Sequence, residues 1–260
     1  MTQQEMNLLA PQKLRELERE HQMKVLCAVE SGSRAWGFAS PDSDFDVRFV
    51  YVRPREFYLK LEKTRDVIEE PIDDTWDVSG WDLPKTLRLL HASNPSIFEW
   101  GASPLVYCST ETWERRIAPA LPAFFRPYKS VYHYLSMAFR TAKENLAGET
   151  VKAKKYFYIL RPILAAKWVI ANGTPPPMLF EELVDSQLEE ALVPMVNELV
   201  RKKKELPELD RIPRIPVLDE YIYAALGELQ VAVDVLPRGD YRPWEPLNRL
   251  FAEILAESSF

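Results

Sequence analysis

The sequence predicts a domain of the α/β or α+β class followed by a helical half. Up to about residue 110, short apolar runs bounded by turn residues alternate with helical patterns. From about residue 128 the apolar residues recur at helical spacing almost throughout. Pro119, Pro122 and Pro127 cluster between the two regions. We therefore predict a soft boundary at residues 118–128 and two domains, residues 1–120 and 121–260.

The N-terminal region contains both kinds of element. Leucines at helical spacing predict an amphipathic helix, and a run rich in Val, Phe and Tyr predicts a strand. Asp82 stands at the N-cap position of a second amphipathic run. The expected elements are a helix over 6–21, strands over 24–29 and 45–52, a short helix over 54–60, strands over 66–70 and 75–81, and a helix after Asp82.

The C-terminal region is a series of helical patterns separated by proline-containing linkers. Proline interrupts a helix because it lacks the backbone N–H and clashes with the preceding turn. The expected helices cover 129–147, 151–171, 186–204, 216–235 and 244–257.

Composition excludes several classes of protein. With Lys+Arg 33 and Asp+Glu 39, the net charge of −6 disfavours global, non-specific binding to nucleic acid or membranes. The three histidines and two cysteines are far apart in the sequence, which excludes a Cys-rich zinc site and a disulfide framework. Isolated thiols, no signal peptide and no apolar run of ~18 residues lead us to expect a cytoplasmic protein without a membrane span.

The segment after the first predicted strand suits an anion. Gly32 and Ser33 follow Glu30 and precede an expected short helix. Such a turn offers free backbone N–H groups, a hydroxyl and the positive end of a helix dipole. Gly32 has no Cβ to keep a ligand away from the backbone. We therefore predict phosphate binding at Gly32 and Ser33.

Carboxylates cluster at the start of the next strand. Asp44 and Asp46 point to the same face, because side chains at i and i+2 of a strand do so. A divalent cation would relieve their repulsion, and oxygen ligands favour Mg²⁺ or Mn²⁺ over zinc. Arg48 shares this face and is expected to contact a carboxylate or a phosphate. A phosphate-binding turn beside metal-binding carboxylates is typical of enzymes that catalyse phosphoryl or nucleotidyl transfer.

A third carboxylate is expected from a neighbouring strand. Asp77 lies inside a strand-like stretch and is the preferred candidate. Asp82 is the competing candidate, although its predicted N-cap position already gives it a structural role.

These residues resemble the signature of the polymerase β-like nucleotidyltransferase superfamily. That signature is Gly-Ser, a spacer, Asp-x-Asp at the start of a strand and a third Asp on a later strand, here Gly32-Ser33, Asp44-Phe45-Asp46 and Asp77. The stretch 32–48 is similar, more narrowly, to the RNA-repair-pathway DNA polymerase β family of predicted nucleotidyltransferases. Segments beginning at Asp82, Asn94 and Lys155 fit the same group.

The resemblance implies an α+β fold with a nucleotidyltransferase-type mixed sheet, then an all-helical domain. Residues 1–120 would be catalytic and residues 121–260 would bind nucleotide or substrate. Asp44, Asp46 and Asp77 would hold Mg²⁺ or Mn²⁺, and an acceptor hydroxyl would attack the α-phosphate of a nucleoside triphosphate and release pyrophosphate. The acceptor could be an RNA or DNA end. The expected nucleotide-binding residues are Gly32, Ser33, Arg34, Arg48, Lys155 and Arg161.

The same sequence features are compatible with other functions. Lys155 and Arg161 lie close to one helical face among aromatic residues, and a solvated helix face would explain them equally well. The chain could be a non-catalytic nucleotide-binding regulatory module. Arg126 and His133 also match the spacing of a helical-domain ribonuclease. No sequence feature specifies the nucleotide base, the acceptor or the oligomeric state.

Overall fold

The computed structural model describes residues 1–70, 76–205 and 211–257. By their internal contacts the residues form two compact units. Unit 1 comprises Met1–Ala35, Asp44–Phe124 and Tyr241–Phe260, and unit 2 comprises Trp36–Ser43 and Phe125–Asp240. The chain therefore passes between the units four times.

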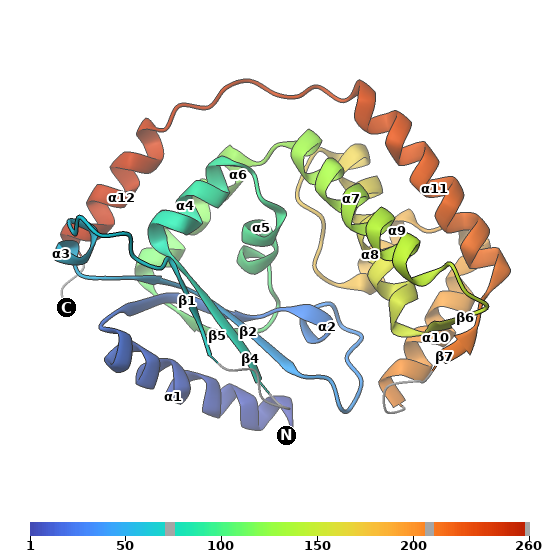
Figure 1. The fold of residues 1–260 in the computed structure, drawn as a ribbon, viewed down its shortest axis with the longest axis horizontal. Coiled ribbons are helices and arrows are strands. Elements are labelled where there is room, and N and C mark those ends of the chain that lie inside the picture. The colour runs from blue at the N-terminus through green and yellow to red at the C-terminus, as the bar shows by residue number, and fades with distance from the viewer. Residues whose placement is uncertain (71–75, 206–210, 258–260) are drawn as a thin grey trace. The chain divides into compact units, whose positions relative to one another are not determined.

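Unit 1 is built on a five-stranded mixed sheet of order β3-β4-β2-β1-β5 (Figure 1). Strand β1 runs antiparallel to β2 and β5, whereas β2 and β4 are parallel. The α+β class is thereby confirmed. The strands are β1 (Lys24–Glu30), β2 (Phe45–Val52), β3 (Val67–Glu69), β4 (Trp76–Asp82) and β5 (Val106–Ser109).

Helix α1 (Gln3–His21) covers one face of this sheet. Its buried residues, among them Leu14 and Leu17, pack against Phe45, Val47 and Phe49 of β2. Alternation along β2 then directs its even-numbered side chains to the opposite face. The predicted apolar face of this strand is confirmed, because Phe45, Val47, Phe49 and Tyr51 are buried in the core.

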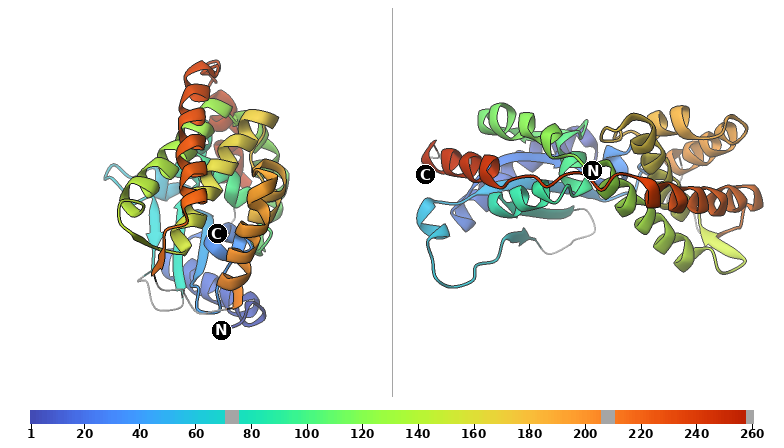
Figure 2. Two further views of the ribbon diagram at one scale, coloured as in Figure 1. Left: turned by 90° about the vertical axis from the view of Figure 1, so that its right-hand side faces the viewer. Right: turned by 90° about the horizontal axis from the view of Figure 1, so that it is seen from above.

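The other helices of unit 1 are mostly short. On the face opposite α1, Trp81 of β4 stacks on Trp100 at 3.8 Å between ring centroids. The last helix packs on α4, so the chain ends in the unit where it began (Figures 1 and 2). The helices are α2 (Gly32–Ala35), α3 (Arg55–Tyr58), α4 (Leu83–His91), α5 (Pro95–Gly101), a π-helical turn (Trp113–Ile117), a 3₁₀ turn (Ala118–Ala120), α6 (Leu121–Phe124) and α12 (Glu245–Glu257).

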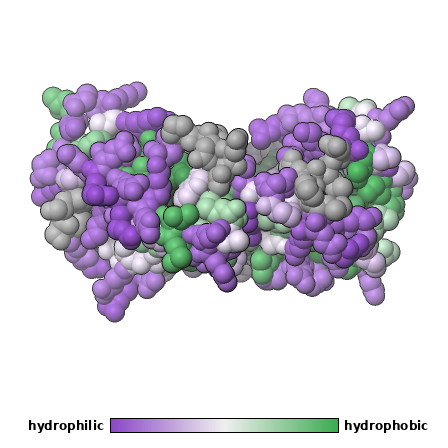
Figure 3. Space-filling view, turned by 90° about the horizontal axis from the view of Figure 1, so that it is seen from below, coloured by the Kyte–Doolittle hydropathy of each residue, from purple (hydrophilic) through white to green (hydrophobic). Residues whose placement is uncertain are grey.

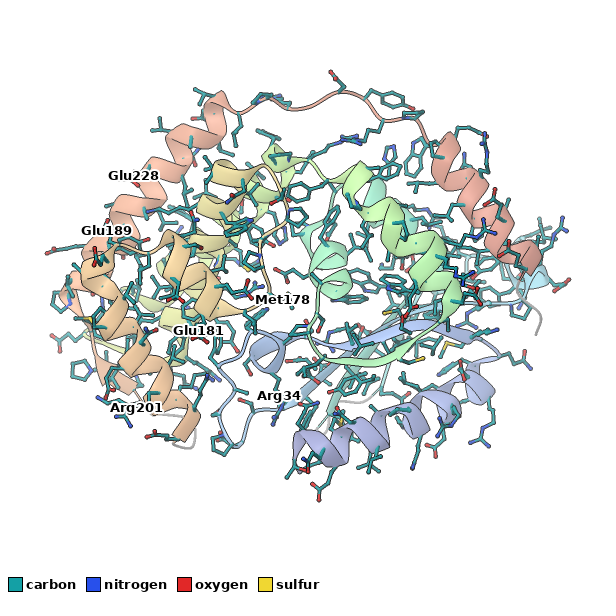
Figure 4. All side chains as sticks on the ribbon, turned by 180° about the vertical axis from the view of Figure 1, so that it is seen from behind. Arg34, Met178, Glu181, Glu189, Arg201 and Glu228 are labelled. Atoms are coloured by element: carbon teal, nitrogen blue, oxygen red, sulfur yellow. The ribbon has the colours of Figure 1, made fainter. Side chains whose placement is uncertain are left out.

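Unit 2 is mainly helical, with α7, α8 and α11 packed together. Its core contains the fully buried aromatic residues Tyr134, Tyr156 and Phe157. The helices are α7 (Pro127–Asn145), α8 (Lys154–Asn172), α9 (Phe180–Gln187), a 3₁₀ turn (Glu190–Leu192), α10 (Val193–Glu205) and α11 (Pro216–Val235). A cavity of about 270 Å³ is lined by Glu181 of α9 and Arg201 of α10, among others (Figure 4).

The segment Trp36–Ser43 is anchored in unit 2 by aromatic contacts. The Phe38 ring lies 5.2 Å from the Phe157 ring and 5.3 Å from the Phe180 ring, between centroids. The Trp36 carbonyl accepts a hydrogen bond from the Phe180 backbone N–H at 2.9 Å. Within the stretch 32–48, residues Trp36–Ser43 therefore pack with the helical unit 2, and the other residues belong to unit 1.

Several elements depart from the sequence-based expectation. Helix α5 is not among the expected elements; it begins at Pro95, and the Asn94 side chain accepts a hydrogen bond from the Ser96 N–H at 2.9 Å. Unit 2 also contains a two-stranded sheet of β6 (Thr150–Lys152) and β7 (Arg211–Pro213), so the predicted helix over 151–171 starts later. Arg211 of β7 pairs with β6 through both its backbone and its side chain, a contact between residues far apart in the sequence.

The surface drawn in Figure 3 is mostly hydrophilic. Among the described residues, no helix has the length and apolar character needed to cross a membrane.

Candidate active site

Strand pairing brings Asp46 and Asp77 together. In the parallel pair β2–β4, Asp46 is directly opposite Asp77. Residues that are paired in this way project to the same face, so both carboxylates lie on the face opposite α1. The sequence placed Asp77 on a neighbouring strand, and the register now makes it the partner of Asp46.

Arg48 bridges the two carboxylates. Its Nη2 donates to Asp46 Oδ1 at 2.9 Å and to Asp77 Oδ2 at 2.7 Å. Its Nη1 donates to the Asp77 carbonyl at 2.7 Å, which fixes the guanidinium from a second side. The side chain is 18% exposed. Of the two contacts expected for Arg48, the structure shows the carboxylate.

The Asp46 carboxylate is largely buried and lies near two other carboxylates and Arg48. Burial raises its pKa above the usual value, and the charges of Asp77 and Asp44 raise it further, while Arg48 opposes the rise. Burial and neighbouring negative charges destabilise the ionised form of such a carboxylate, and a nearby cation stabilises it. The ionised pair therefore suits a divalent cation electrostatically.

The position of the Asp46 carboxylate requires a glycine at residue 32. Gly32 has φ +58, and a Cβ built on it would lie 1.9 Å from Asp46 Oδ2. The missing Cβ, which we expected to admit a ligand, thus admits the Asp46 carboxylate. Ser33 is 7% exposed and lies in the four-residue helix α2 directly after this turn.

Asp44 and Arg34 lie at the same end of the sheet (Figure 4 labels Arg34). Arg34 Nε donates to the Asp44 carbonyl at 3.1 Å, and its guanidinium lies 3.7 Å from the Phe45 ring centroid. The Asp44 residue is exposed. Within 1–70, 76–205 and 211–257, no three Asp, Glu, His or Cys side chains converge closely enough to hold a metal ion. Of the three predicted metal ligands, the structure therefore brings Asp46 and Asp77 together, while Asp44 does not converge with them.

Asp82 lies outside this cluster. It is opposite Tyr51 in the β2–β4 register, about 17 Å along the strand from Asp77. Its Oδ1 accepts a hydrogen bond from the Tyr58 hydroxyl at 2.6 Å, and burial raises its pKa to about 6. It occupies the N-cap position of α4 as predicted, but its side chain makes no cap hydrogen bond.

Lys155 and Arg161 both lie on α8 of unit 2. Arg161 is 3% exposed, with its guanidinium 4.3 Å from the Trp36 ring centroid and Nη2 3.6 Å from Met178 Sδ. Arg161 thereby holds the segment Trp36–Ser43 on the helical unit. Lys155 is half-buried, 5.9 Å from the Tyr158 ring centroid.

Sequence reasoning missed Glu30. This carboxylate is fully buried, and its Oε1 accepts a hydrogen bond from the Asp46 backbone N–H at 2.7 Å. Burial raises its pKa to about 7, while hydrogen bonds from Tyr107 and Asp46 oppose the rise. The available signal was an acidic residue ending the apolar run Lys24–Glu30, where a strand usually carries its core.

Two known proteins are similar to this chain over most of its length. The uncharacterized protein YcgL of Bacillus subtilis (strain 168) is 44% identical over 245 residues, which cover 94% of this chain and 94% of that protein. The crystal structure of a nucleotidyltransferase-like protein from Exiguobacterium sibiricum 255-15 matches over 96% of this chain and 80% of that one. The TM-score of this match is 0.33, and the sequence identity is 13%.

The family comparison covers nearly the whole chain. Residues 6–253, which include most of both units and every candidate site residue, match the family described as the RNA repair pathway DNA polymerase beta family. The resemblance inferred from Gly32-Ser33, Asp44-x-Asp46 and Asp77 is therefore confirmed: the chain belongs to the RNA repair pathway DNA polymerase beta family.

Proposed function

We propose that the protein is a metal-dependent nucleotidyltransferase that moves a nucleoside monophosphate from a nucleoside triphosphate to an acceptor hydroxyl. The supporting observation is the pairing of Asp46 with Asp77 on adjacent parallel strands, against the Gly32 turn. Membership of a polymerase β-like family supports the same reaction class. The family description further favours an RNA or DNA end as the acceptor.

In this reaction the acceptor oxygen forms a bond to the α-phosphorus while the bond to the β-phosphate breaks. Pyrophosphate leaves with the electron pair, and the acceptor loses its proton. Asp44, Asp46 and Asp77 would hold Mg²⁺ or Mn²⁺, which would neutralise phosphate charge and lower the pKa of the acceptor hydroxyl.

The chain's own residues prepare this site. Gly32 brings the backbone turn against Asp46, and Ser33 lies beside it to meet the outgoing phosphates. Arg48 donates hydrogen bonds to both carboxylates, and Arg34 holds the backbone at Asp44. On α8, the half-buried Lys155 is the candidate for a triphosphate contact, whereas Arg161 anchors Trp36.

Labelled-transfer assays test the proposal. The full chain is incubated with each α-labelled nucleoside triphosphate, Mg²⁺ or Mn²⁺, and RNA or DNA ends. Asp46→Asn and Asp77→Asn should each reduce transfer at least ~100-fold, because each removes a charged ligand. Asp82→Asn, on the same sheet but bound to Tyr58, is the matched control and should retain it. Absence of transfer in the wild type, or loss of activity only in Asp82→Asn, would contradict the proposal.

Arg48 favours a second candidate, a nucleotide-binding module without turnover. A cation that already pairs with Asp46 and Asp77 can satisfy them without a metal ion. Calorimetry that shows nucleotide binding unaffected by chelator, together with no transfer to any acceptor, would support this candidate over the first.

A further inference from the structure

Glu30 is a buried carboxylate at the end of β1, with 0% exposure. It is opposite Val47 in the β1–β2 register, and Val47 faces α1. The Glu30 side chain is therefore on the α1 side of the sheet, while the Asp46 carboxylate is on the other side. A buried acid rarely persists without partners, because desolvating a charge is costly.

Its partners form a short chain of contacts that ends at Asp46. Gln3 Nε2 of α1 donates to the Tyr107 hydroxyl at 3.2 Å, and that hydroxyl donates to Glu30 Oε2. The other oxygen, Oε1, accepts from the Asp46 N–H at 2.7 Å. Both carboxylate oxygens are thus engaged, one by β5 and one by β2.

The contact replaces a ladder hydrogen bond at the end of the strand pair. Beyond the Glu30–Val47 pair, β1 turns away into Ser31 and Gly32. The Asp46 carbonyl still accepts from the Ser31 N–H at 2.8 Å, whereas the Asp46 N–H is bound by the Glu30 side chain. Both backbone polar groups of Asp46 are therefore fixed from β1, immediately beneath its carboxylate.

We infer that Glu30 is a positioning residue for Asp46: through the Asp46 backbone it fixes the metal-binding carboxylate against Gly32 from the opposite face of the sheet. Its role in metal binding rests on the proposed function, whereas its role in holding Asp46 rests on the hydrogen bonds alone. Asp46 has little tolerance for displacement, because its Oδ2 occupies the space that a Cβ on Gly32 would fill.

The chain offers a matched control. Asp82 is also a buried carboxylate of unit 1 bound by a tyrosine hydroxyl, from Tyr58, but it does not reach Asp46. We compare Glu30→Leu with Asp82→Leu, which both remove a buried carboxyl group, and with Glu30→Gln, which keeps an oxygen acceptor for the Asp46 N–H. Tyr107→Phe removes one partner of Glu30 and leaves its contact with Asp46.

Two measurements on the full chain test the inference. Amide hydrogen exchange followed by NMR reports the Asp46 N–H without any metal, with the Phe49 amide in the middle of β2 as internal reference. Glu30→Leu should accelerate Asp46 exchange at least tenfold relative to Phe49, since its amide donor loses the acceptor. Electron paramagnetic resonance should show Mn²⁺ binding weakened at least tenfold. Glu30→Gln, Asp82→Leu and Tyr107→Phe should stay within about threefold of the wild type in both.

The outcomes separate the two proposals. Unchanged Asp46 exchange in Glu30→Leu, or equal acceleration in Asp82→Leu, would overturn the positioning role even if the wild type transfers nucleotides. A wild type that neither binds Mn²⁺ nor transfers nucleotides would overturn the proposed function, while Asp46 exchange would still decide whether Glu30 holds Asp46.

Discussion

At the scale of single residues, charge balance around Asp46 is the feature with the clearest consequences. Two carboxylates on adjacent strands repel each other, and Arg48 offsets that repulsion through hydrogen bonds of 2.9 and 2.7 Å. Because one guanidinium nitrogen donates to both carboxylates, the positive charge of Arg48 lies between Asp46 and Asp77, where any cation would be stabilised. A metal ion bound as we propose would therefore compete with Arg48 for the same negative charge.

Replacement of Arg48 tests this competition. Arg48→Gln removes a fixed positive charge beside Asp46 and Asp77, so Mn²⁺ should bind at least tenfold more tightly than to the wild type. Titration followed by electron paramagnetic resonance measures the change. Weaker Mn²⁺ binding would show instead that Arg48 mainly holds Asp77 in place. A loss confined to nucleotide affinity would assign Arg48 to the phosphates.

Substitution of Gly32 has a matched control elsewhere in the chain. Both Gly32 and Gly173 have positive φ, but a Cβ at Gly173 meets no atom within 4 Å, whereas at Gly32 it meets Asp46 Oδ2. Gly173→Ala should cost about 1 kcal/mol of backbone strain. Gly32→Ala should destabilise the protein more and abolish transfer. Denaturant unfolding and the labelled-transfer assay measure both, and equal costs with retained transfer would contradict the close approach of Asp46.

At the scale of elements, strand β4 carries two aspartates with different roles at its two ends. Asp77 contacts Arg48 on the face opposite α1, while Asp82 precedes α4 and accepts from Tyr58. Asp77 and Asp82 point to opposite faces of the sheet, because side chains alternate along a strand and these residues are an odd number of positions apart, namely five. A single strand thus positions one carboxylate for the candidate site and buries the other.

Burial of Asp82 should make stability decrease between pH 4 and pH 6. The folded protein keeps the Asp82 proton up to about pH 6, whereas the unfolded chain loses it near 3.8, the ordinary pKa of an aspartate. The unfolded state therefore binds fewer protons in this window, and the free energy of unfolding falls by ~3 kcal/mol as pH rises through it. Asp82→Asn should lack this part of the decrease. Urea unfolding at pH 4, 5 and 6 measures it, and parallel slopes for the two proteins would contradict the burial.

At the scale of the whole molecule, neither compact unit is a continuous stretch of chain. Residues Trp36–Ser43 pack with unit 2 and Tyr241–Phe260 with unit 1, a division that differs from the predicted one at residues 120 and 121. In α12, Leu247 is 2% exposed, and Trp244, directly before this helix, stacks on His91 at 3.6 Å between ring centroids. The last helix therefore contributes to the stability of the unit that holds the candidate site.

A core substitution in α12 tests this assignment. Leu247→Ala should destabilise unit 1 by about 2–5 kcal/mol, because it opens a cavity beneath α12. Val235→Ala, at a residue that is 79% exposed, is the control and should have little effect. Hydrogen exchange with mass spectrometry should show lost protection in α4 while α8 of unit 2 keeps its protection. Loss of protection in α8 with α4 unchanged would contradict the assignment.

The local pattern of the sequence predicted the elements that are long or strongly patterned. The strand over 45–52 and the helix over 216–235 match β2 and α11 residue for residue. Periodicity suffices there because each element carries its own alternation of buried and exposed positions. It failed for β6 and β7, which pair with each other across a long separation in the sequence.

For the candidate site, the sequence by itself determined which residues are present and their spacing: Gly32-Ser33, Asp44-x-Asp46 and a later aspartate. Only the tertiary structure decided that Asp77 is opposite Asp46, that Arg48 bridges them, and that Glu30 binds the Asp46 N–H. The physical reason is that local pattern depends on residues a few positions apart. The partners of a buried charge are instead set by strand register. Register brings Arg48 to Asp77, 29 positions away in the sequence, and Glu30 to Asp46, 16 positions away.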